Sequence, residues 1–128
     1  MTARSSRGAQ IALAVGLALG LDGTSMPVRA QDGESLFRRF CSTCHTVEPE
    51  KNRLGPSLAG IVGRKAGMVA GFAYSEANKT SSVVWDDAHL DQYLADPKAF
   101  MPGTKMLFAG MKSPDDRKAV IEYLRAAK

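Results

Sequence analysis

The chain has 128 residues, with 17 Lys and Arg against 13 Asp and Glu, so its formal net charge is +4. A length of this order predicts one domain. Three arginines and one aspartate lie within residues 1–30, which leaves residues 31–128 with 14 basic and 12 acidic side chains and a net charge of +2. So small a charge excludes nucleic-acid binding as the main function, although it allows a local basic patch.

Residues 1–30 have the composition of a secretory signal peptide. Two arginines precede an apolar run at 11–21, and Ala30 ends a cleavage site of small residues. The run has 11 residues, whereas a helix that spans a bilayer needs about 20. We therefore expect export, cleavage after Ala30 and one mature domain at 31–128, with an uncleaved membrane anchor as the alternative.

The mature chain is expected to begin with a helix over residues 33–40. Asp32 can cap its first turn. An apolar stripe recurs at helical spacing and must pack against another element. The stripe consists of Gly33, Leu36, Phe37 and Phe40. Because the helix leads directly into Cys41, its packing would fix the position of the motif that follows.

Residues 41–45 read Cys-Ser-Thr-Cys-His, which is the C-x-x-C-H pattern of c-type haem attachment. Cys41 and Cys44 lie on one turn, so each thiol can add to a vinyl group of the same porphyrin, and His45 then places an imidazole nitrogen under the iron. A redox dithiol usually accompanies a βαβ pattern, which we do not find. A closed zinc site needs four ligands, and only His89 remains as a further Cys or His donor. The motif therefore predicts one covalent haem c.

Residues 46–85 are expected to be mainly loop, because Pro and Gly are frequent there. A brief helix is expected only near Glu76–Lys79. The carbonyl of Pro56 can accept a hydrogen bond from the second ring nitrogen of His45, which would fix the ring. Four side chains join a polar donor to a bulky body, so they could meet haem propionates or be ordinary surface and core residues. They are Arg64, Tyr74, Asn78 and Trp85.

Two further long helices are predicted. One begins at Asp86 or Asp87 and ends near Ala95, because the residue before Pro97 is pushed out of the α region. Its apolar face consists of Leu90, Tyr93 and Leu94. The other begins with Ser113 as N-cap and Pro114 at the first helical position. Its apolar stripe is expected to face residues 33–40 and consists of Ala119, Val120, Tyr123, Leu124 and Ala127.

Within residues 97–106, Pro102-Gly103 is expected to form a turn, followed by a segment with little regular structure. A loop of this kind can carry a thioether sulfur to the open face of an iron, and a Met ligand raises the potential of a His-ligated haem. Met106 lies in this segment. Three other methionines compete with it, since most methionines are simple packing residues; they are Met68, Met101 and Met111.

Residues 31–128 resemble a class I cytochrome c, the group that includes mitochondrial cytochrome c and bacterial cytochrome c2. Besides the C-x-x-C-H motif, the resemblance is carried by Leu54–Leu58, Gly63–Gly67, Gly71–Trp85, Asp96–Lys98, Pro102–Met106 and Phe108–Gly110. It implies an all-α fold in which three main helices, short helices and long loops surround one covalently bound haem. The sequence departs from mitochondrial forms at Ser35 and Phe40, where basic residues are frequent.

The resemblance also implies roles for individual residues. Met106 becomes the sixth iron ligand opposite His45, and Pro56 becomes the acceptor for His45. The residues implied near the propionates are Arg64, Tyr74, Trp85 and Thr104. Asn78 and Tyr93 are implied in a polar network beside the haem. Where the terminal helices cross, Gly33 and Phe37 would meet Val120 and Tyr123.

The function that this resemblance implies is that of a soluble, monomeric one-electron carrier of the bacterial periplasm, without catalytic residues. It would accept electrons from a quinol-oxidising complex and donate them to a terminal oxidase or photosynthetic reaction centre. Lys98 and Lys105 would lie at the haem edge and dock acidic redox partners. The alternatives are a dedicated acceptor for one periplasmic dehydrogenase, a haem peroxidase with a labile Met106 bond, and a subunit tethered by its N-terminus.

Overall fold

The computed structural model describes residues 32–128, so the expected signal peptide at 1–30 and the expected mature start at Gln31 lie outside the described residues. Within the described part the regular structure is helical, apart from one isolated bridge between Lys65 and Val84. The helices are α1 (Gly33–Phe40), α2 (Glu76–Thr80), α3 (Asp87–Ala95), α4 (Pro97–Phe100) and α5 (Pro114–Ala126). The expected all-α class is confirmed. Between residues 32 and 128, no helix combines the length and apolar character needed to cross a bilayer.

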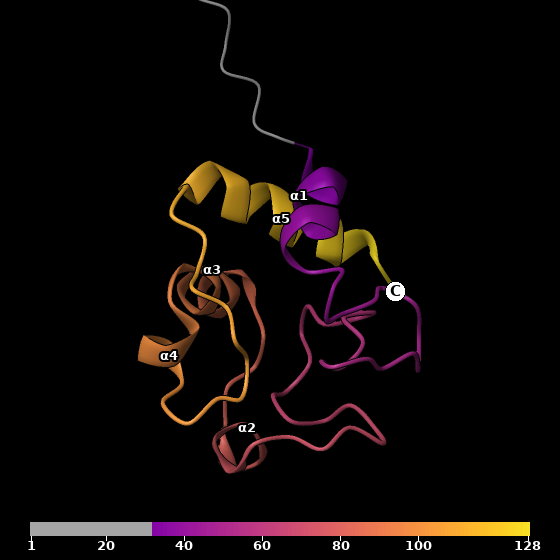
Figure 1. Cartoon of the computed structure of the whole chain (residues 1–128), viewed down its shortest axis with the longest axis vertical. Helices are drawn as coiled ribbons and strands as arrows, with labels where there is room; N and C mark the ends of the chain where they lie inside the picture. The colour runs from indigo at the N-terminus through magenta and orange to yellow at the C-terminus, as the bar shows by residue number, and fades with distance from the viewer. Residues whose placement is uncertain (1–31) are drawn as a thin grey trace, which may run out of the picture.

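Helices α1 and α5 pack across each other at one end of the molecule (Figure 1). Leu36 and Val120 are fully buried between them, and the rings of Phe37 and Tyr123 lie 5.5 Å apart. The expected cap of α1 is wrong. Asp32 occupies the N-cap position but makes no side-chain capping bond, because its carboxylate accepts a hydrogen bond from the Ser35 hydroxyl at 3.4 Å instead.

Helix α3 packs against both α5 and the short α4. The Asp86 carboxylate caps α3 by accepting the His89 N–H at 2.8 Å. The helix ends where expected, but Asp96 then caps α4 by accepting the Ala99 N–H at 3.1 Å. The sequence pattern did not predict this short helix α4. Pro97 favours both features, since a proline that ends one helix also suits the first position of the next.

A long loop of residues 41–75 connects α1 to α2 on the side of the molecule away from α4, residues 81–86 lead from α2 to α3, and residues 101–113 connect α4 to α5 (Figure 1). Ser75 caps α2 by accepting the Asn78 N–H at 3.2 Å. The rings of Trp85 and Tyr93 pack in a tilted arrangement with centroids 4.8 Å apart, which anchors residues 81–86 to α3. The arrangement leaves the loop side and the helical side facing each other across a pocket.

Candidate functional site

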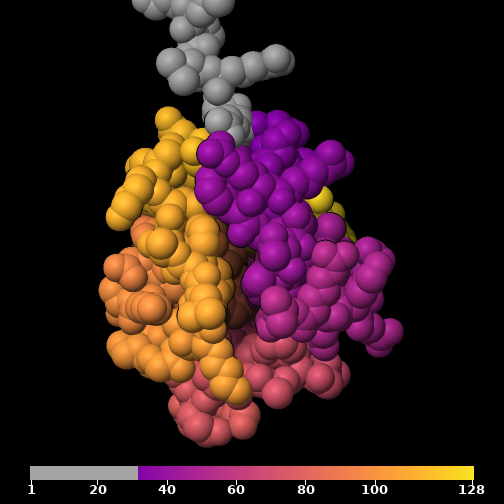
Figure 2. Space-filling view, in the orientation of Figure 1, coloured from indigo at the N-terminus to yellow at the C-terminus, as the bar shows by residue number. Residues whose placement is uncertain are grey.

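One cavity of about 380 Å³ lies between the N-terminal and C-terminal halves of the described chain. Figure 2 shows its mouth as the hollow between the indigo and magenta surface of the first half and the orange and yellow surface of the second. Most of its lining side chains are apolar, and Val120 and Leu124 of α5 contribute to its wall. An apolar cavity of this size with a few polar groups is typical of a cofactor site.

The two cysteines line one wall of this cavity. The N–H groups of Cys44 and His45 both donate to the Cys41 carbonyl, at 3.0 and 2.9 Å, so the motif forms a tight turn at the end of α1. Both thiols are free and half-buried. Burial, with a smaller contribution from Cys44, raises the pKa of the Cys41 thiol to about 11. The Cys41 thiol therefore lacks the lowered pKa that is typical of a reactive redox cysteine.

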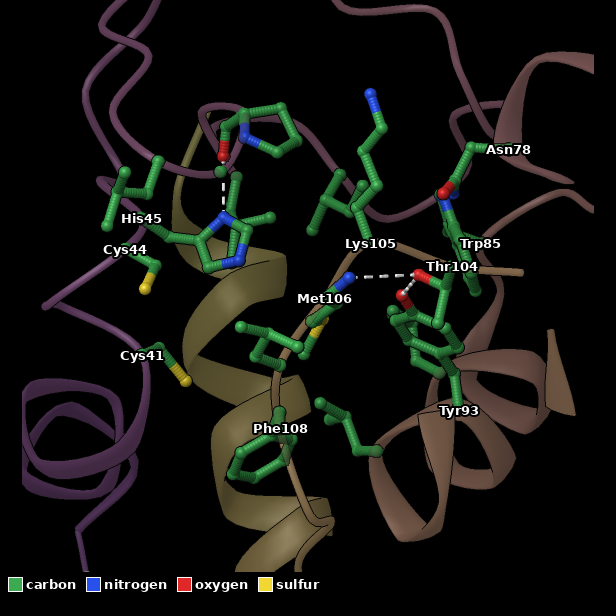
Figure 3. Close-up of a pocket in the computed structure, with 18 of the residues that line it drawn as sticks. Cys41, Cys44, His45, Asn78, Trp85, Tyr93, Thr104, Lys105, Met106 and Phe108 are labelled. Carbon is green, nitrogen blue, oxygen red and sulfur yellow. Dashed lines mark hydrogen bonds between the residues drawn. The ribbon is translucent and has the colours of Figure 1, made fainter. Parts of the chain in front are cut away.

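His45 lies beside the thiols, and a hydrogen bond to the Pro56 carbonyl fixes its imidazole ring (Figure 3). Its Nδ1–H donates to the Pro56 carbonyl at 2.7 Å, which is the expected hydrogen bond. Burial lowers the pKa of the imidazole, and the bond to Pro56 opposes this more weakly. The ring is therefore neutral near pH 7, and its Nε2 lone pair is available to bind a metal in the cavity.

Gly55 leaves room for the imidazole ring of His45, a role that the sequence analysis did not assign. A Cβ atom on Gly55 would lie 2.7 Å from both ring nitrogens of His45. The Gly55 N–H donates to the Cys44 carbonyl at 2.8 Å, so the loop closes directly onto the motif. The role could have been predicted from the sequence, because Gly55 directly precedes Pro56, the expected acceptor for His45. Any side chain here would displace the imidazole.

Met106 lies on the cavity wall opposite the C-x-x-C-H motif (Figure 3). Its location in the structure distinguishes it from the three competing methionines. Met101 and Met111 are 5% and 4% exposed within the hydrophobic core, and Met68 is 62% exposed. Of these four, Met106 is the one that lines the cavity. The structure thus brings one thioether into the same pocket as the imidazole and the two thiols.

A short polar chain supports the Met106 backbone. The Thr104 hydroxyl accepts the Met106 N–H at 3.3 Å and lies 3.0 Å from the Tyr93 hydroxyl (Figure 3). Burial raises the pKa of Tyr93, and the bond to Thr104 lowers it by less. Tyr93 therefore stays protonated and can take part in this network at neutral pH.

Of the residues implied near the propionates, Tyr74, Trp85 and Thr104 line the cavity. Asn78 and Tyr93, implied in the polar network, line it as well. Arg64 is not among the lining residues. Its guanidinium donates to the carbonyls of Ala59 and Ser57, at 2.9 and 3.0 Å, and so stiffens its own loop. The resemblance implied Arg64 near the propionates, and nothing in the sequence pattern identified these two carbonyls as its acceptors.

The residues present fit a covalently attached haem. Two thiols and an imidazole nitrogen line one wall, a thioether lines the opposite wall, and apolar side chains fill the space between them. A zinc site would need a cluster of donors. Residues 32–128 contain no group of three or more His, Cys, Asp or Glu side chains able to hold a metal ion.

Comparison with known proteins agrees with this geometry. Residues 30–128 match the family model described as Cytochrome c. Cytochrome c2 iso-2 of Magnetospirillum molischianum is 57% identical over 89 residues, which cover 70% of this chain and 92% of that protein. Cytochrome c of Arabidopsis thaliana is 47% identical over 74% of this chain and 86% of its own. Among solved structures, cytochrome cH from Methylobacterium extorquens is 48% identical, with a TM-score of 0.68 over 73% of this chain and 93% of its own.

Sequence identity, fold and cavity therefore lead to the same assignment. The match covers almost all of each relative, and the C-x-x-C-H motif lies at the cavity wall where covalent attachment requires it. The chain belongs to the cytochrome c family, whose members are electron carriers, and its cofactor is covalently bound haem c.

Proposed function

We propose that the mature chain is a diffusible one-electron carrier of the bacterial periplasm, with His45 and Met106 as the axial ligands and with Cys41 and Cys44 as the thioether anchors. The observation that carries the proposal is the opposition of His45 and Met106 across one apolar cavity. When bound, haem c supplies an iron that alternates between the ferrous and ferric states. A quinol-oxidising complex is the proposed donor, and a terminal oxidase or photosynthetic reaction centre is the proposed acceptor.

The protein residues favour electron transfer over catalysis. With His45 and Met106 both bound, the metal keeps no open position for a substrate, in contrast to a catalytic metal centre. Apolar burial disfavours the additional charge of the ferric state, and a Met ligand raises the potential further. Tyr93 stays neutral beside Met106, so it adds no charge that would offset this effect.

Purified protein from the soluble fraction is expected to begin at Gln31 and to carry one haem that survives acid-acetone extraction. The reasons are the small-residue cleavage site before Gln31 and the two thioethers proposed at Cys41 and Cys44. Intact-mass measurement before and after extraction tests both parts. Haem lost on extraction would contradict covalent attachment, whereas a retained N-terminus with protein in the membrane fraction would support the tethered alternative.

Lys98 and Lys105 are proposed to steer acidic partners toward the cavity mouth. Both side chains are exposed, and the Lys105 ammonium points away from the cavity (Figure 3). The Glu76 carboxylate pairs with Lys79 at 2.9 Å and lies near enough to Lys105 that this lysine also lowers its pKa slightly, so Glu76 partly balances the local charge. Some salt dependence of docking should remain, although it is weakened by Glu76.

Reversal of both lysines to Glu is expected to slow the bimolecular rate with an acidic redox partner by about tenfold at low salt. The measurement is stopped-flow oxidation of the reduced protein at several ionic strengths. Lys118→Glu with Lys128→Glu, which makes the same charge change on and after α5, is the control and should change the rate by less than about twofold. Equal effects of the two reversals, or no salt effect, would mean that docking is mainly apolar.

A further inference from the structure

The segment that carries Met106 is fastened at its two ends. We call residues 101–113, between α4 and α5, the methionine loop. At its first end, Thr104 connects the Met106 N–H to Tyr93. At its second end, the Met111 N–H donates to the Leu94 carbonyl of α3 at 2.8 Å. In the described structure, residues 107–110 make no backbone hydrogen bond, so hydrogen bonds hold this part of the loop at these two ends.

Arg117 adds a second fastening at the C-terminal end. Its Nη1 donates to the Met111 carbonyl at 2.8 Å and to the Lys112 carbonyl at 3.1 Å. Its Nε donates to the Asp91 carboxylate of α3 at 2.6 Å. The Arg117 side chain is only 11% exposed. One guanidinium thus joins α5, α3 and the methionine loop.

The geometry of this contact suits a guanidinium and no other cationic side chain. The planar fork of Arg presents several donors in fixed directions, so that Nε can point at Asp91 while Nη1 points at the loop carbonyls. A Lys ammonium is a single point of charge and cannot reach all of these acceptors at once. Loss of the fork would leave the carbonyls of Met111 and Lys112 without their shared donor.

We infer that Arg117, oriented by Asp91, is a positioning residue for Met106: it holds the C-terminal end of the methionine loop so that the thioether stays at the iron. The inference rests on the proposed axial role of Met106. A loosened loop end increases the fraction of molecules in which the sulfur has left, and an added ligand binds only to that fraction. Arg117 therefore sets how firmly the sixth position is closed.

Free imidazole is a suitable probe of this closure, because it binds the ferric haem only where the sulfur has left. Arg117→Lys in the haem-loaded protein is expected to speed imidazole binding by about tenfold, the scale of one lost charge-assisted hydrogen bond. Asp91→Asn leaves the bonds to the loop intact and is expected to give a smaller increase. It also serves as the test if Arg117→Lys does not fold.

Arg125→Lys is the matched control. Arg125 pairs with Asp87, so this ion pair joins the same two helices. The side chains of Arg125 and Asp87 are both more than half exposed. Arg125 donates its hydrogen bond to Asp87 and not to the methionine loop. Imidazole binding should therefore match that of the unmodified protein.

A double-mutant cycle separates positioning from general stability. In a Met106→Ala background, Arg117→Lys should leave the imidazole rate unchanged, since no sulfur remains to be displaced. An equal increase in both backgrounds would overturn the inference, as would a lowered free energy of unfolding with an unchanged imidazole rate. If Met106→Ala alone leaves the sixth position closed, the proposed ligand is wrong and the inference falls with it.

Discussion

Replacement of Met106 by alanine is expected to lower the reduction potential and to open the iron to small ligands, while haem stays attached through Cys41 and Cys44. The reason is that the thioether is lost, whereas both anchors and His45 on the opposite wall are untouched. The affinity of the ferric protein for cyanide should rise by at least about 100-fold, which corresponds to an open form populated at roughly 1% when the sulfur is present. Redox titration and cyanide titration measure the two effects.

The other methionines supply the controls for this experiment. Met68→Ala should change neither quantity, because its side chain is 62% exposed and lies outside the cavity wall. Met101→Ala and Met111→Ala should lower the free energy of unfolding by about 2 to 5 kcal/mol, as is usual for truncation of a buried Met, without opening the iron. Cyanide affinity that rises for any of these three and not for Met106→Ala would show that the ligand has been misassigned.

The sequence was most informative where the physical cause is local. Ser113, Pro114 and the acidic residues after them act on their own helix, and the first turn of α5 forms as they predict. The Asp86 cap of α3 is local in the same sense. The C-x-x-C-H motif also carries its chemistry within five residues. These features could be predicted because each depends on neighbours in the chain and hardly at all on the packing of distant segments.

Prediction failed where several local solutions have nearly the same energy. Asp32 can cap α1 or accept the Ser35 hydroxyl, and the structure has the second arrangement. Asp96 could end a helix or begin one, and it does both. In each case a short polar side chain has two acceptable partners within a few residues, and the sequence pattern does not choose between them.

Long-range contacts were the second limit. Arg117 reaches Asp91, 26 residues earlier, and the end of the methionine loop. Its position after the first turn of α5 is equally typical of a solvated arginine. Arg64 shows the converse, since its guanidinium is taken up by the carbonyls of its own loop. The family resemblance implied His45 and Met106 as the axial ligands and placed Arg64 near the propionates, but it implied no role for Arg117.

Gly33→Ala is expected to lower the free energy of unfolding of the haem-loaded protein by about 3 kcal/mol, the upper part of the usual range for overpacking. A Cβ atom at this position would lie 2.9 Å from the Tyr123 Cβ and closer still to the carbonyl oxygen of Ala119. The second contact is with helix backbone, so no rotamer change can relieve it. Helices α1 and α5 would have to separate.

That separation should reach the haem site, because α1 leads directly into Cys41 and because Val120 and Leu124 of α5 line the cavity. Denaturant unfolding of the holoprotein measures the loss of stability. Ser35→Ala, at an exposed position on the same helix, is the control and should stay within about 0.5 kcal/mol. If Gly33→Ala is tolerated as well as Ser35→Ala, the close approach of the terminal helices does not limit the stability of this fold.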